Sequence, residues 1–376
     1  MVMKILVLEI NYKLGNMLRT SGVDFYRLIQ PMKALRDNTG WEIELRKDPF
    51  DGYPEKNWRE IARNFDIIYT GYNMDKPEGY IELLFACLKE GTKLVVDVDD
   101  NIFEVQDDNP VYPRFKVGAK EGTVIRSIIE NNPYLTCTTQ ELKDRILHFT
   151  KRPADSIEVL DNSIDEDVYY ATPKKKSLHL FYSGTHTHKK DINLPEFKNA
   201  LKRVMLEHPK LEFHSIGMYE PEFQIMFKKR YKFIDGSADF PTFINIWRDE
   251  IKNVGIGLCP LQDSEFAKCK SSVKWKEYSA GFCVTIASNV YPYKAIIENG
   301  KTGFLCSTEE EWYKAITEMI ENKEYRKTVV KNANREVMKK YNAKKNWVKY
   351  RDYFEKIYVP KIIVDRDVVF GDLQKR

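Results

Sequence analysis

Residues 266–288 read FAKCKSSVKWKEYSAGFCVTIAS, and this stretch carries the clearest information about the fold. A polar loop leads to Ser271 or Ser272, either of which suits a helix N-cap, and the pattern predicts a helix over 273–281. An apolar, β-rich run over 283–287 follows directly. Continuous runs of this kind are typical of strands that are buried on both faces of a parallel sheet.

The same alternation of strand and helix continues in both directions along the chain. Strands are expected over 2–10, 41–45, 66–70, 93–98, 134–137, 156–160, 178–182, 211–216, 254–260 and 283–287. Helices are expected over 24–36, 58–64, 80–89, 194–207, 240–251 and 273–281, with two more within 309–340 and one over 344–358. This order predicts an α/β fold with two doubly wound sheets.

The polar, proline-bearing segment 173–176 suits a linker between two units of similar size. It divides the chain into an N-terminal domain over 1–172 and a C-terminal domain over 173–340. The last part, 341–376, is expected to form a basic, aromatic helix and a tail that pack back on the N-terminal domain.

Composition narrows the class of protein. At 376 residues two or three domains are expected. With 43% hydrophobic and 31% charged residues, a disordered, fibrous or disulfide-scaffold protein is excluded. The formal charge of +4 does not require a nucleic-acid or membrane partner. No run approaches the roughly 20 apolar residues of a spanning helix, and the six cysteines form no C-x-x-C pair, so reduced thiols in a cytoplasmic protein are expected.

The start of the 273–281 helix has the chemistry of an anion site. Free N–H groups of a first helical turn attract anions, and Lys268, Lys270 and Lys274 add positive charge there. Glu277 follows one turn later, where its carboxylate could accept the two hydroxyls of a ribose. This arrangement predicts a nucleoside diphosphate site. The alternative is that Lys274 and Glu277 form an exposed i,i+3 ion pair.

Residues 277–288 resemble the second half of the donor-site signature of retaining GT-B glycosyltransferases, the family 4-like group. Glu277 matches the second Glu of that signature. The segment after it is one residue shorter at the turn, with Cys283 where Pro is usual, and Cys269 stands where the first Glu is expected. Residues 182–191 resemble the first loop of the nucleotide domain, with Lys190 near the family's phosphate-binding Lys and no Arg after Gly184. Residues 291–305 resemble the loop, helix, turn and strand that follow the signature. Segments 26–31 and 95–103 resemble a bacterial and phage subset of the group, and 160–165 resembles the family's interdomain segment, with Asp161 in place of the usual Pro.

The resemblance implies a GT-B fold, with two Rossmann-like domains facing a central cleft, and transfer of a sugar from a nucleoside diphosphate sugar to a hydroxyl with retention at the anomeric carbon. A UDP-sugar is favoured as donor, and no metal or other cofactor is expected. The expected catalytic residues are Lys190, Lys274 and His186. The expected donor-binding residues are Gly184, Thr185, Lys270, Ser271, Ser272, Glu277 and Tyr291. The expected acceptor-binding residues are Ser21, Gly22, Arg27, Asp99 and Asp100, and the acceptor domain is the N-terminal one.

Several alternatives stay open at this stage. The acceptor is expected to be a glycan or its lipid-linked precursor, which would associate the protein with a membrane, and a hydroxylated base in duplex DNA is the phage-type alternative. Cys269 also allows an inactive sugar-nucleotide-binding protein. The acids at 97–100 form a D-x-D pattern that could hold a divalent metal in a single-domain transferase, and His186 with His188 could form a metal pair. No oligomeric state is predicted.

Overall fold

The structure is a computed structural model that describes residues 2–9, 12–14, 17–47, 57–72, 77–169, 171, 175 and 177–359. For residues 12–14, 17–19, 47, 77 and 78 only the backbone is described. Most of the expected linker at 173–176, and the end of the expected tail at 360–376, lie outside the described residues.

The N-terminal domain is built on a parallel six-stranded sheet with the order β4-β1-β5-β6-β7-β8. Its strands are β1 (Lys4–Glu9), β4 (Glu42–Lys47), β5 (Ile67–Gly71), β6 (Lys93–Val98), β7 (Tyr134–Cys137) and β8 (Ile157–Val159). In the central strands β1, β5 and β6 nearly every side chain is buried. Both faces of the sheet are therefore covered by helices, as continuous apolar runs predict.

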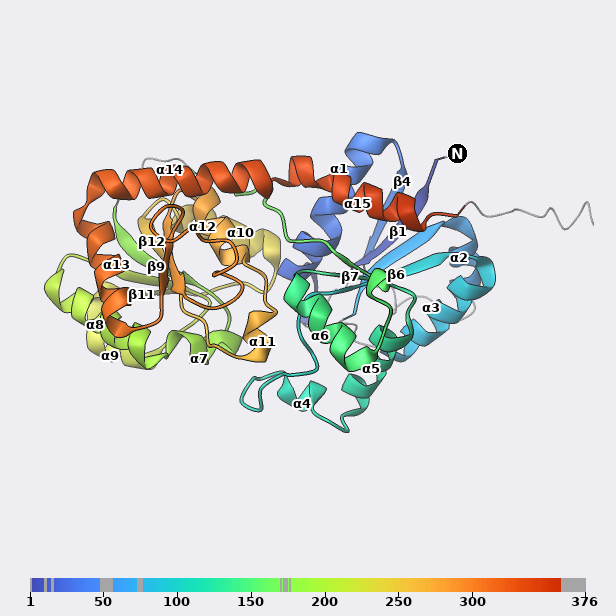
Figure 1. The fold of residues 1–376 in the computed structure, drawn as a ribbon, viewed down its shortest axis with the longest axis horizontal. Coiled ribbons are helices and arrows are strands. Elements are labelled where there is room, and N and C mark those ends of the chain that lie inside the picture. Colours follow the sequence, from blue (N-terminus) through green and yellow to red (C-terminus); the bar gives the residue numbers. More distant parts are fainter. Residues whose placement is uncertain are drawn as a thin grey trace, which may run out of the picture.

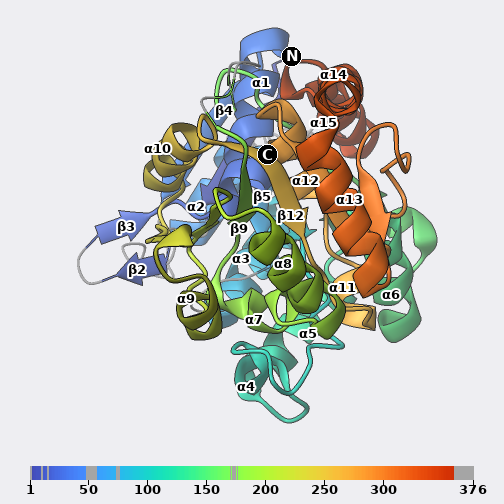
Figure 2. The same cartoon turned by 90° about the vertical axis from the view of Figure 1, so that its left-hand side faces the viewer.

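The helices of this domain follow the strands in turn. They are a π-helical turn η1 (Asp24–Ile29) that continues into α1 (Gln30–Thr39), then α2 (Trp58–Asn64), α3 (Pro77–Glu90), α4 (Tyr112–Phe115), α5 (Lys120–Asn131), α6 (Gln140–Thr150) and the 3-10 turn η3 (Ala154–Ser156). A small antiparallel pair, β2 (Tyr12–Leu14) and β3 (Met17–Arg19), stands between β1 and η1. Figure 2 shows this hairpin projecting beside α10 of the other domain.

The C-terminal domain has a second parallel six-stranded sheet with the order β11-β10-β9-β12-β13-β14. Its strands are β9 (His179–Ser183), β10 (Phe213–Ile216), β11 (Tyr231–Ile234), β12 (Val254–Cys259), β13 (Val284–Ser288) and β14 (Phe304–Cys306). In this order the chain reverses direction across the sheet between β9 and β12. A crevice at the carboxyl ends of these two strands is where Rossmann folds bind ligands.

The helices of the C-terminal domain cover both faces of that sheet (Figure 2). They are the 3-10 turn η4 (His186–His188), α7 (Lys189–Ile192), α8 (Pro195–Glu207), α9 (Pro221–Phe227), the 3-10 turn η5 (Lys228–Arg230), α10 (Phe240–Glu250), α11 (Glu265–Lys268), α12 (Val273–Ala280), α13 (Glu309–Glu321) and α14 (Lys323–Lys340).

The last helix, α15 (Ala343–Ile357), crosses from one domain to the other. Figure 1 shows α14 and α15 running in line along the top of the molecule, α14 over the C-terminal domain and α15 over the N-terminal one. Tyr350, Tyr353 and Phe354 of α15 are buried in a cluster with side chains of β1, β5 and α1. The ring of Phe354 meets that of Tyr69 edge-on at 5.6 Å between centroids. The end of the chain thus closes the core of the first domain.

The strands and helices expected from the sequence form within one to three residues of their expected bounds. Three corrections concern the C-terminal domain. Residues 291–296 form successive turns, not the expected helix. The edge strand β11 and helix α9 were not expected, because β11 has exposed side chains at Lys232 and Phe233 and lacks a continuous apolar run. Helix α12 ends at Ala280, one residue before the expected Gly281, which is its C-cap, and Phe282 of the following turn has a left-handed backbone with φ of 55°.

The packing of α15 gives a test of stability. Phe354 is fully buried, so Phe354→Ala is expected to lower the free energy of unfolding by about 3–5 kcal/mol through lost burial and a residual cavity. Urea unfolding followed by circular dichroism measures this. Leu206→Ala, at a side chain that is 68% exposed, is the control and should change stability by about 0.5 kcal/mol or less. Equal effects of the two changes would show that α15 does not pack as described.

Candidate functional site

The carboxyl ends of both sheets face the seam between the domains, and two cavities lie in this seam. The first, of about 330 Å³, is named the α12 cavity because the start of α12 forms one wall. The second, of about 480 Å³, is named the α7 cavity because it lies against α7. Leu261 and Lys270 line both cavities, which are therefore neighbours. Each cavity has walls from both domains.

Two lysines bring positive charge to the α12 cavity. Lys270 Nζ lies 3.7 Å from Asp100 Oδ1 and 4.7 Å from the centre of the Phe266 ring. Lys274 Nζ lies 4.9 Å from the centre of the Tyr182 ring, and among the described residues no carboxylate oxygen lies within 4.0 Å of it. Burial lowers the pKa of Lys274. Lys274 is therefore a partly buried cation that lacks a paired acid, which is an unfavourable state until an anion binds.

The first turn of α12 completes this side of the cavity. Ser272 is the N-cap residue, as expected, but its side chain accepts no hydrogen bond from the helix. Ser271 Oγ instead accepts a hydrogen bond from Asn162 Nδ2 at 3.0 Å, which joins the helix start to the N-terminal domain. Ser271, Val273 and Lys274 line the cavity. First-turn N–H groups have no partner within a helix and carry partial positive charge, so this wall favours an anion.

Glu277 lies deeper, one turn along α12. Its carboxylate is 6% exposed, and Oε1 accepts hydrogen bonds from Tyr26 at 2.6 Å and from Tyr169 at 2.9 Å. The two tyrosine hydroxyls also contact each other. Burial raises the pKa of Glu277, while the two hydrogen bonds lower it. Glu277 does not form an exposed ion pair with Lys274, and in this state of the molecule it links α12 to the N-terminal domain.

The acids of β6 have two different roles. Asp97 is buried and paired with Arg27 through two hydrogen bonds of 2.9 and 2.7 Å. Arg27 also donates to Asn162 Oδ1 at 3.0 Å and to the carbonyl of Leu160, so its guanidinium is engaged by groups of the N-terminal domain itself. This leaves Asp99 and Asp100 to face the α12 cavity, together with Gly22.

Asp99 carries a proton at neutral pH. Burial, followed by the nearby charges of Asp100 and Asp97, raises the pKa of Asp99 to about 8. A protonated carboxyl adds no negative charge to the cavity and can donate a hydrogen bond. The acidic wall of the cavity is therefore weaker in negative charge than the sequence suggests.

The loop after β9 divides between the two cavities. Thr185 and His188 line the α12 cavity, whereas His186 and Lys190 line the α7 cavity. His188 Nδ1 lies 2.7 Å from Asp191 Oδ2, and burial, with the charge of Lys274, lowers the pKa of His188 to about 4, so this imidazole is neutral.

Two further residues of this loop region constrain the site. A Cβ added at Gly184 would lie 2.6 Å from the Tyr182 hydroxyl, so the backbone there passes directly over this ring. Lys190 forms an ion pair with Asp108 of the N-terminal domain. The structure therefore does not bring Lys190 and His186 together with Lys274.

Several expected residues lie off both cavities, and others take their place. Ser21 bonds to Asp24 at the start of η1, with 2.7 Å between Oγ and Oδ2. Tyr291 is 36% exposed, and Tyr293 of the same loop lines the α12 cavity. The expected residues absent from both linings are Ser21, Gly184, Ser272, Glu277 and Tyr291. Thr138 and Asn162 line the cavity and were not expected, although Asn162 lies in the segment 160–165 that carries the family resemblance.

Among the described residues, no three potential metal ligands from either cavity come close enough together to share an ion. Asp97 of the D-x-D pattern is held by Arg27, and His188 is held by Asp191. Within the described part of the chain, His179, Glu212 and His214 are the group close enough to share an ion. They lie at the starts of β9 and β10, at the opposite end of the sheet from the cavities, and His179 Nδ1 already accepts a backbone hydrogen bond at 3.2 Å.

Solved structures with the same architecture are glycosyltransferases. Anabaena Alr3699/HepE in complex with UDP-glucose matches with a TM-score of 0.65 and 14% identity, over 94% of this chain and 100% of that one. Sucrose-phosphate synthase from Thermosynechococcus elongatus matches with a TM-score of 0.64 and 12% identity, over 94% and 99%. A glycosyltransferase from Rickettsia africae matches with a TM-score of 0.60 and 12% identity, over 95% and 98%. No protein-family model and no curated protein sequence matches the chain. The likeness establishes the GT-B fold, with two Rossmann-like domains.

The charge of Asp99 gives a pH test of the α12 cavity. Below pH 8 Asp99 is neutral, and above it the ionised carboxylate repels a bound anion. The affinity for inorganic pyrophosphate, measured by calorimetry, is expected to fall between pH 7 and pH 9 and to fall less steeply in Asp99→Asn. Burial also lowers the pKa of Lys274, and any titration of Lys274 or of pyrophosphate itself is common to both proteins, so the difference between the two profiles reports Asp99. Identical pH profiles for the two proteins would contradict the assigned protonation state.

Proposed function

We propose that this protein is a retaining glycosyltransferase of the family 4-like group that transfers a sugar from a UDP-sugar to a hydroxyl of a glycan or of its lipid-linked precursor. The observation that carries the proposal is the unpaired, partly buried Lys274 at the start of α12, at the switch point of a Rossmann-like sheet. Lysine ammonium groups and helix N-termini are the groups that proteins use for phosphates.

In this proposal the diphosphate occupies the α12 cavity. Its oxygens accept hydrogen bonds from Lys270, Lys274 and the first-turn N–H groups of α12. Glu277 accepts the ribose hydroxyls in place of the hydroxyls of Tyr26 and Tyr169. The two tyrosines then hold the carboxylate in position while the site is empty, because a buried carboxylate needs hydrogen-bond donors.

The proposed chemistry is the exchange of one bond at the anomeric carbon. The bond from this carbon to the diphosphate oxygen breaks, and a bond to the acceptor oxygen forms on the same face of the sugar. Negative charge grows on the leaving phosphate, where Lys270, Lys274 and the helix N–H groups stabilise it. The acceptor proton passes to the leaving phosphate. Gly22, Asp99 and Asp100 position the acceptor from the N-terminal domain, which lowers the entropic part of the barrier.

The choice of UDP and the stereochemistry rest on different observations. Three structures of Alr3699/HepE, which has the same fold, are complexes with UDP, with UDP-glucose, and with UDP and glucose. These complexes support UDP as the nucleotide. Retention is supported by the resemblance of residues 277–288 to the retaining signature.

A surface of the C-terminal domain favours a lipid-linked acceptor. Tyr219, Ile225 and Phe233 are 45%, 75% and 39% exposed, and the rings of Tyr219 and Phe233 meet at 5.3 Å between centroids. Three exposed lysines flank them: Lys228, Lys229 and Lys232. Exposed apolar groups beside lysines suit an anionic lipid surface. The described helices include none that is long and apolar enough to span a membrane. We therefore propose a protein that works at a membrane surface on its cytoplasmic side.

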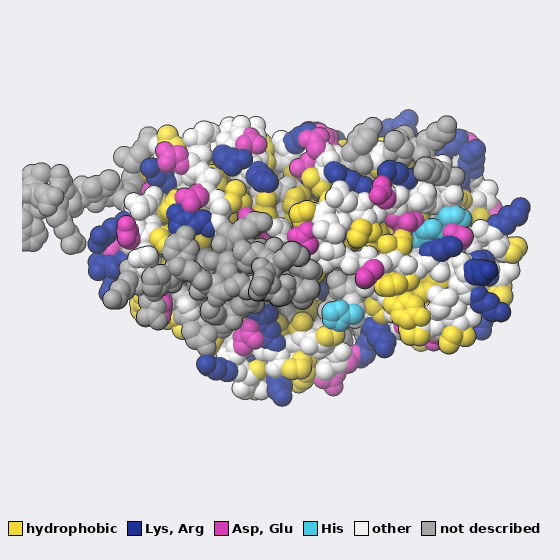
Figure 3. Space-filling model, turned by 180° about the vertical axis from the view of Figure 1, so that it is seen from behind, with side chains coloured by type: hydrophobic (Ala, Val, Ile, Leu, Met, Phe, Trp, Pro, Cys, Tyr) yellow, Lys and Arg dark blue, Asp and Glu magenta, His cyan; other side chains and the backbone are white. Residues whose placement is uncertain are grey.

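The face seen in Figure 3 shows hydrophobic and basic side chains next to one another at the right, over the C-terminal domain, and acidic and basic side chains interspersed elsewhere. Interspersed charge of this kind is unlike the continuous basic surface that binds duplex DNA. Neither this face nor the solved structures of the same fold favour duplex DNA as the acceptor.

The lipid surface has its own test. The protein is expected to sediment with vesicles of phosphatidylglycerol and phosphatidylcholine, less so with phosphatidylcholine alone, because the lysines need anionic lipid. Ile225→Asp places a charge in the contact and should release most of the bound protein, whereas Leu206→Asp, at an equally exposed position on α8, should not. Equal sedimentation of both variants would assign binding to some other surface.

The diphosphate assignment is tested by removing the unpaired cation. Lys274→Ala is expected to weaken UDP binding about ten- to hundredfold, the loss of one charge-assisted hydrogen-bonding group, as measured by calorimetry. Glu277→Ala should also weaken UDP binding and should affect pyrophosphate much less.

Lys268→Ala is the matched control, because Lys268, at the end of the neighbouring helix α11, pairs with Glu265 at 2.8 Å and lines neither cavity. Wild-type affinity in Lys274→Ala would refute the assignment. The release of glucose from UDP-glucose is also measured without acceptor. Slow release indicates an enzyme, whereas an inactive nucleotide-binding protein would release none.

A further inference from the structure

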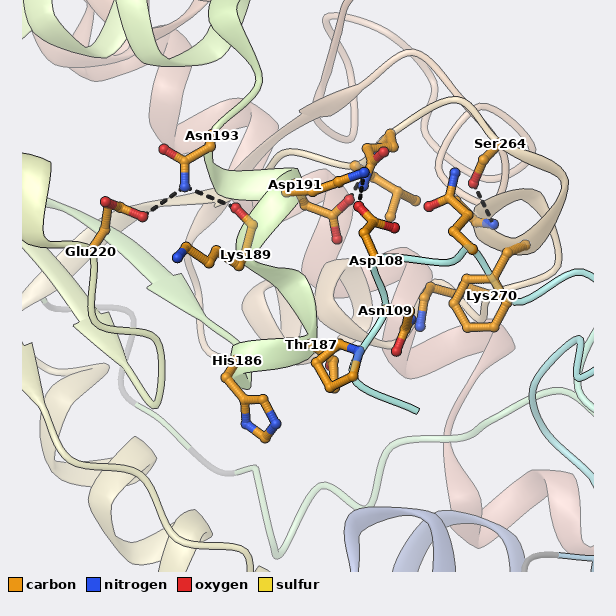
Figure 4. A pocket seen from close by; sticks show the side chains of 17 residues that line it. Asp108, Asn109, His186, Thr187, Lys189, Asp191, Asn193, Glu220, Ser264 and Lys270 are labelled. Carbon is orange, nitrogen blue, oxygen red and sulfur yellow. Dashed lines mark hydrogen bonds and ion pairs between the residues drawn. The ribbon is translucent and has the colours of Figure 1, made fainter. Parts of the chain in front are cut away.

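Apart from Leu261 and Lys270, which line both cavities, the residues of the α7 cavity have no part in the diphosphate site described above. Its inner wall comes from η4, α7 and the loop that leads to α8, and its outer wall comes from the N-terminal loop 106–110 (Figure 4). The loop 261–267 closes the side that adjoins the α12 cavity. At about 480 Å³ it is large enough for a pyranose ring with bound water.

A buried carboxylate dominates the inner wall. Glu220 is 6% exposed, lines the cavity, and among the described residues has no Lys, Arg or His nitrogen within 4.0 Å. Its Oε2 accepts a hydrogen bond from Asn193 Nδ2 at 2.6 Å, and Asn193 Nδ2 also donates to the carbonyl of Lys189 at 2.9 Å. Figure 4 shows these two bonds fixing the amide beside the carboxylate. Each carboxylate oxygen keeps capacity to accept a further hydrogen bond.

The outer wall adds polar groups from the other domain. Asp108 reaches across the seam and pairs with Lys190, and Gln106 and Asn109 stand beside it on the same loop. Asp108, Asp191 and Glu220 offset the charges of Lys189, Lys190 and Lys270 in the same lining, so the cavity lacks the excess of positive charge that a second phosphate would need. The lining thus offers acceptors and amides for neutral hydroxyl groups.

Apolar surface completes the lining. Pro110, Leu261 and Phe266 line the cavity along with the polar groups, and Lys270 lies over the ring of Phe266 with 4.7 Å from Nζ to the ring centre. A pyranose presents hydroxyls at its rim and C–H groups on its faces. Carboxylates and amides on one wall with an apolar patch on another match both parts of such a ring.

We propose that the α7 cavity binds the sugar ring that lies next to the diphosphate, with Glu220, Asn193 and Asp108 accepting and donating hydrogen bonds to its hydroxyls. The proposal rests on the proposed function, because Leu261 and Lys270, shared by both cavities, place this ring beside the phosphates. The ring belongs either to the donor, as the sugar to be transferred, or to the acceptor. Hydrogen bonds to ring hydroxyls would recognise the donor ring and the acceptor ring alike.

The test measures sugar binding with UDP bound. Saturation-transfer NMR of methyl α-D-glucopyranoside is recorded on the full chain with saturating UDP, and the affinities of UDP and UDP-glucose are compared by calorimetry. If the cavity binds the acceptor ring, methyl α-D-glucopyranoside is expected to give a saturation-transfer signal. A donor ring gives about tenfold tighter binding of UDP-glucose than of UDP. Either result is expected to disappear in Glu220→Gln and in Asp108→Asn.

The variants separate a binding role from a structural one. Glu220 is buried at the start of α9, so Glu220→Gln is checked by its unfolding midpoint, and Asp108, which is partly exposed, gives a second variant that leaves the core intact. Glu222→Gln is the control, because Glu222 is two residues away, pairs with Lys198 and lines neither cavity. Retention of the sugar effect in Asp108→Asn and in folded Glu220→Gln would overturn the proposal, as would its absence from wild-type protein that still binds UDP. Failure to bind UDP would instead count against the proposed function.

Discussion

The proposed diphosphate site depends on the positive charge of Lys274. This ammonium group is partly buried, and among the described residues no carboxylate lies at ion-pair distance from it. Taking a cation out of water is costly unless an anion or several hydrogen bonds compensate for the lost hydration. Lys276, two residues along the same helix, shows the compensated case. It is fully buried, and its Nζ donates to Asp161 at 2.6 Å and to the carbonyl of Asn162 at 2.8 Å. Lys276 is therefore structural, whereas Lys274 is the lysine of α12 whose charge suits a bound anion.

Three contacts across the seam hold the two domains together around the cavities. Cys269, from the loop before α12, is 1% exposed and packs into the core of the N-terminal domain, and its carbonyl accepts a hydrogen bond from Thr139 at 3.0 Å. Glu277, Tyr26 and Tyr169 form a second contact, and the stacked rings of Phe25 and Phe240, 4.0 Å apart, form a third. Because these contacts hold the carboxyl ends of the two sheets together, the cavities acquire walls from both domains.

The sequence predicts the sheets well, because most of their strands are continuous apolar runs of four to six residues that are buried on both faces, as in β1, β5, β12 and β13. It also predicts the start of α12, since a serine pair followed by lysines is a local pattern. The edge strand β11 escapes this reasoning because half of its side chains are exposed.

The site itself is only partly predictable, for a different reason. Whether a side chain faces a cavity depends on contacts between residues far apart in the chain. Arg27 is 70 residues from Asp97, and Glu277 is 251 residues from Tyr26. Lys190 and Lys274 both suit a phosphate by sequence, yet only the position of Asp108 in the folded molecule draws Lys190 into the other cavity. Asn193 and Glu220 carry no motif at all and become neighbours only through the fold.

A crystal structure of the complex with UDP tests the central claim most directly. Phosphate oxygens are expected within about 3.2 Å of Lys274 Nζ and of a first-turn N–H of α12. The ribose hydroxyls are expected to donate hydrogen bonds to the carboxylate of Glu277. Phosphates bound at Lys190 in the α7 cavity, with Lys274 left without a partner, would contradict it.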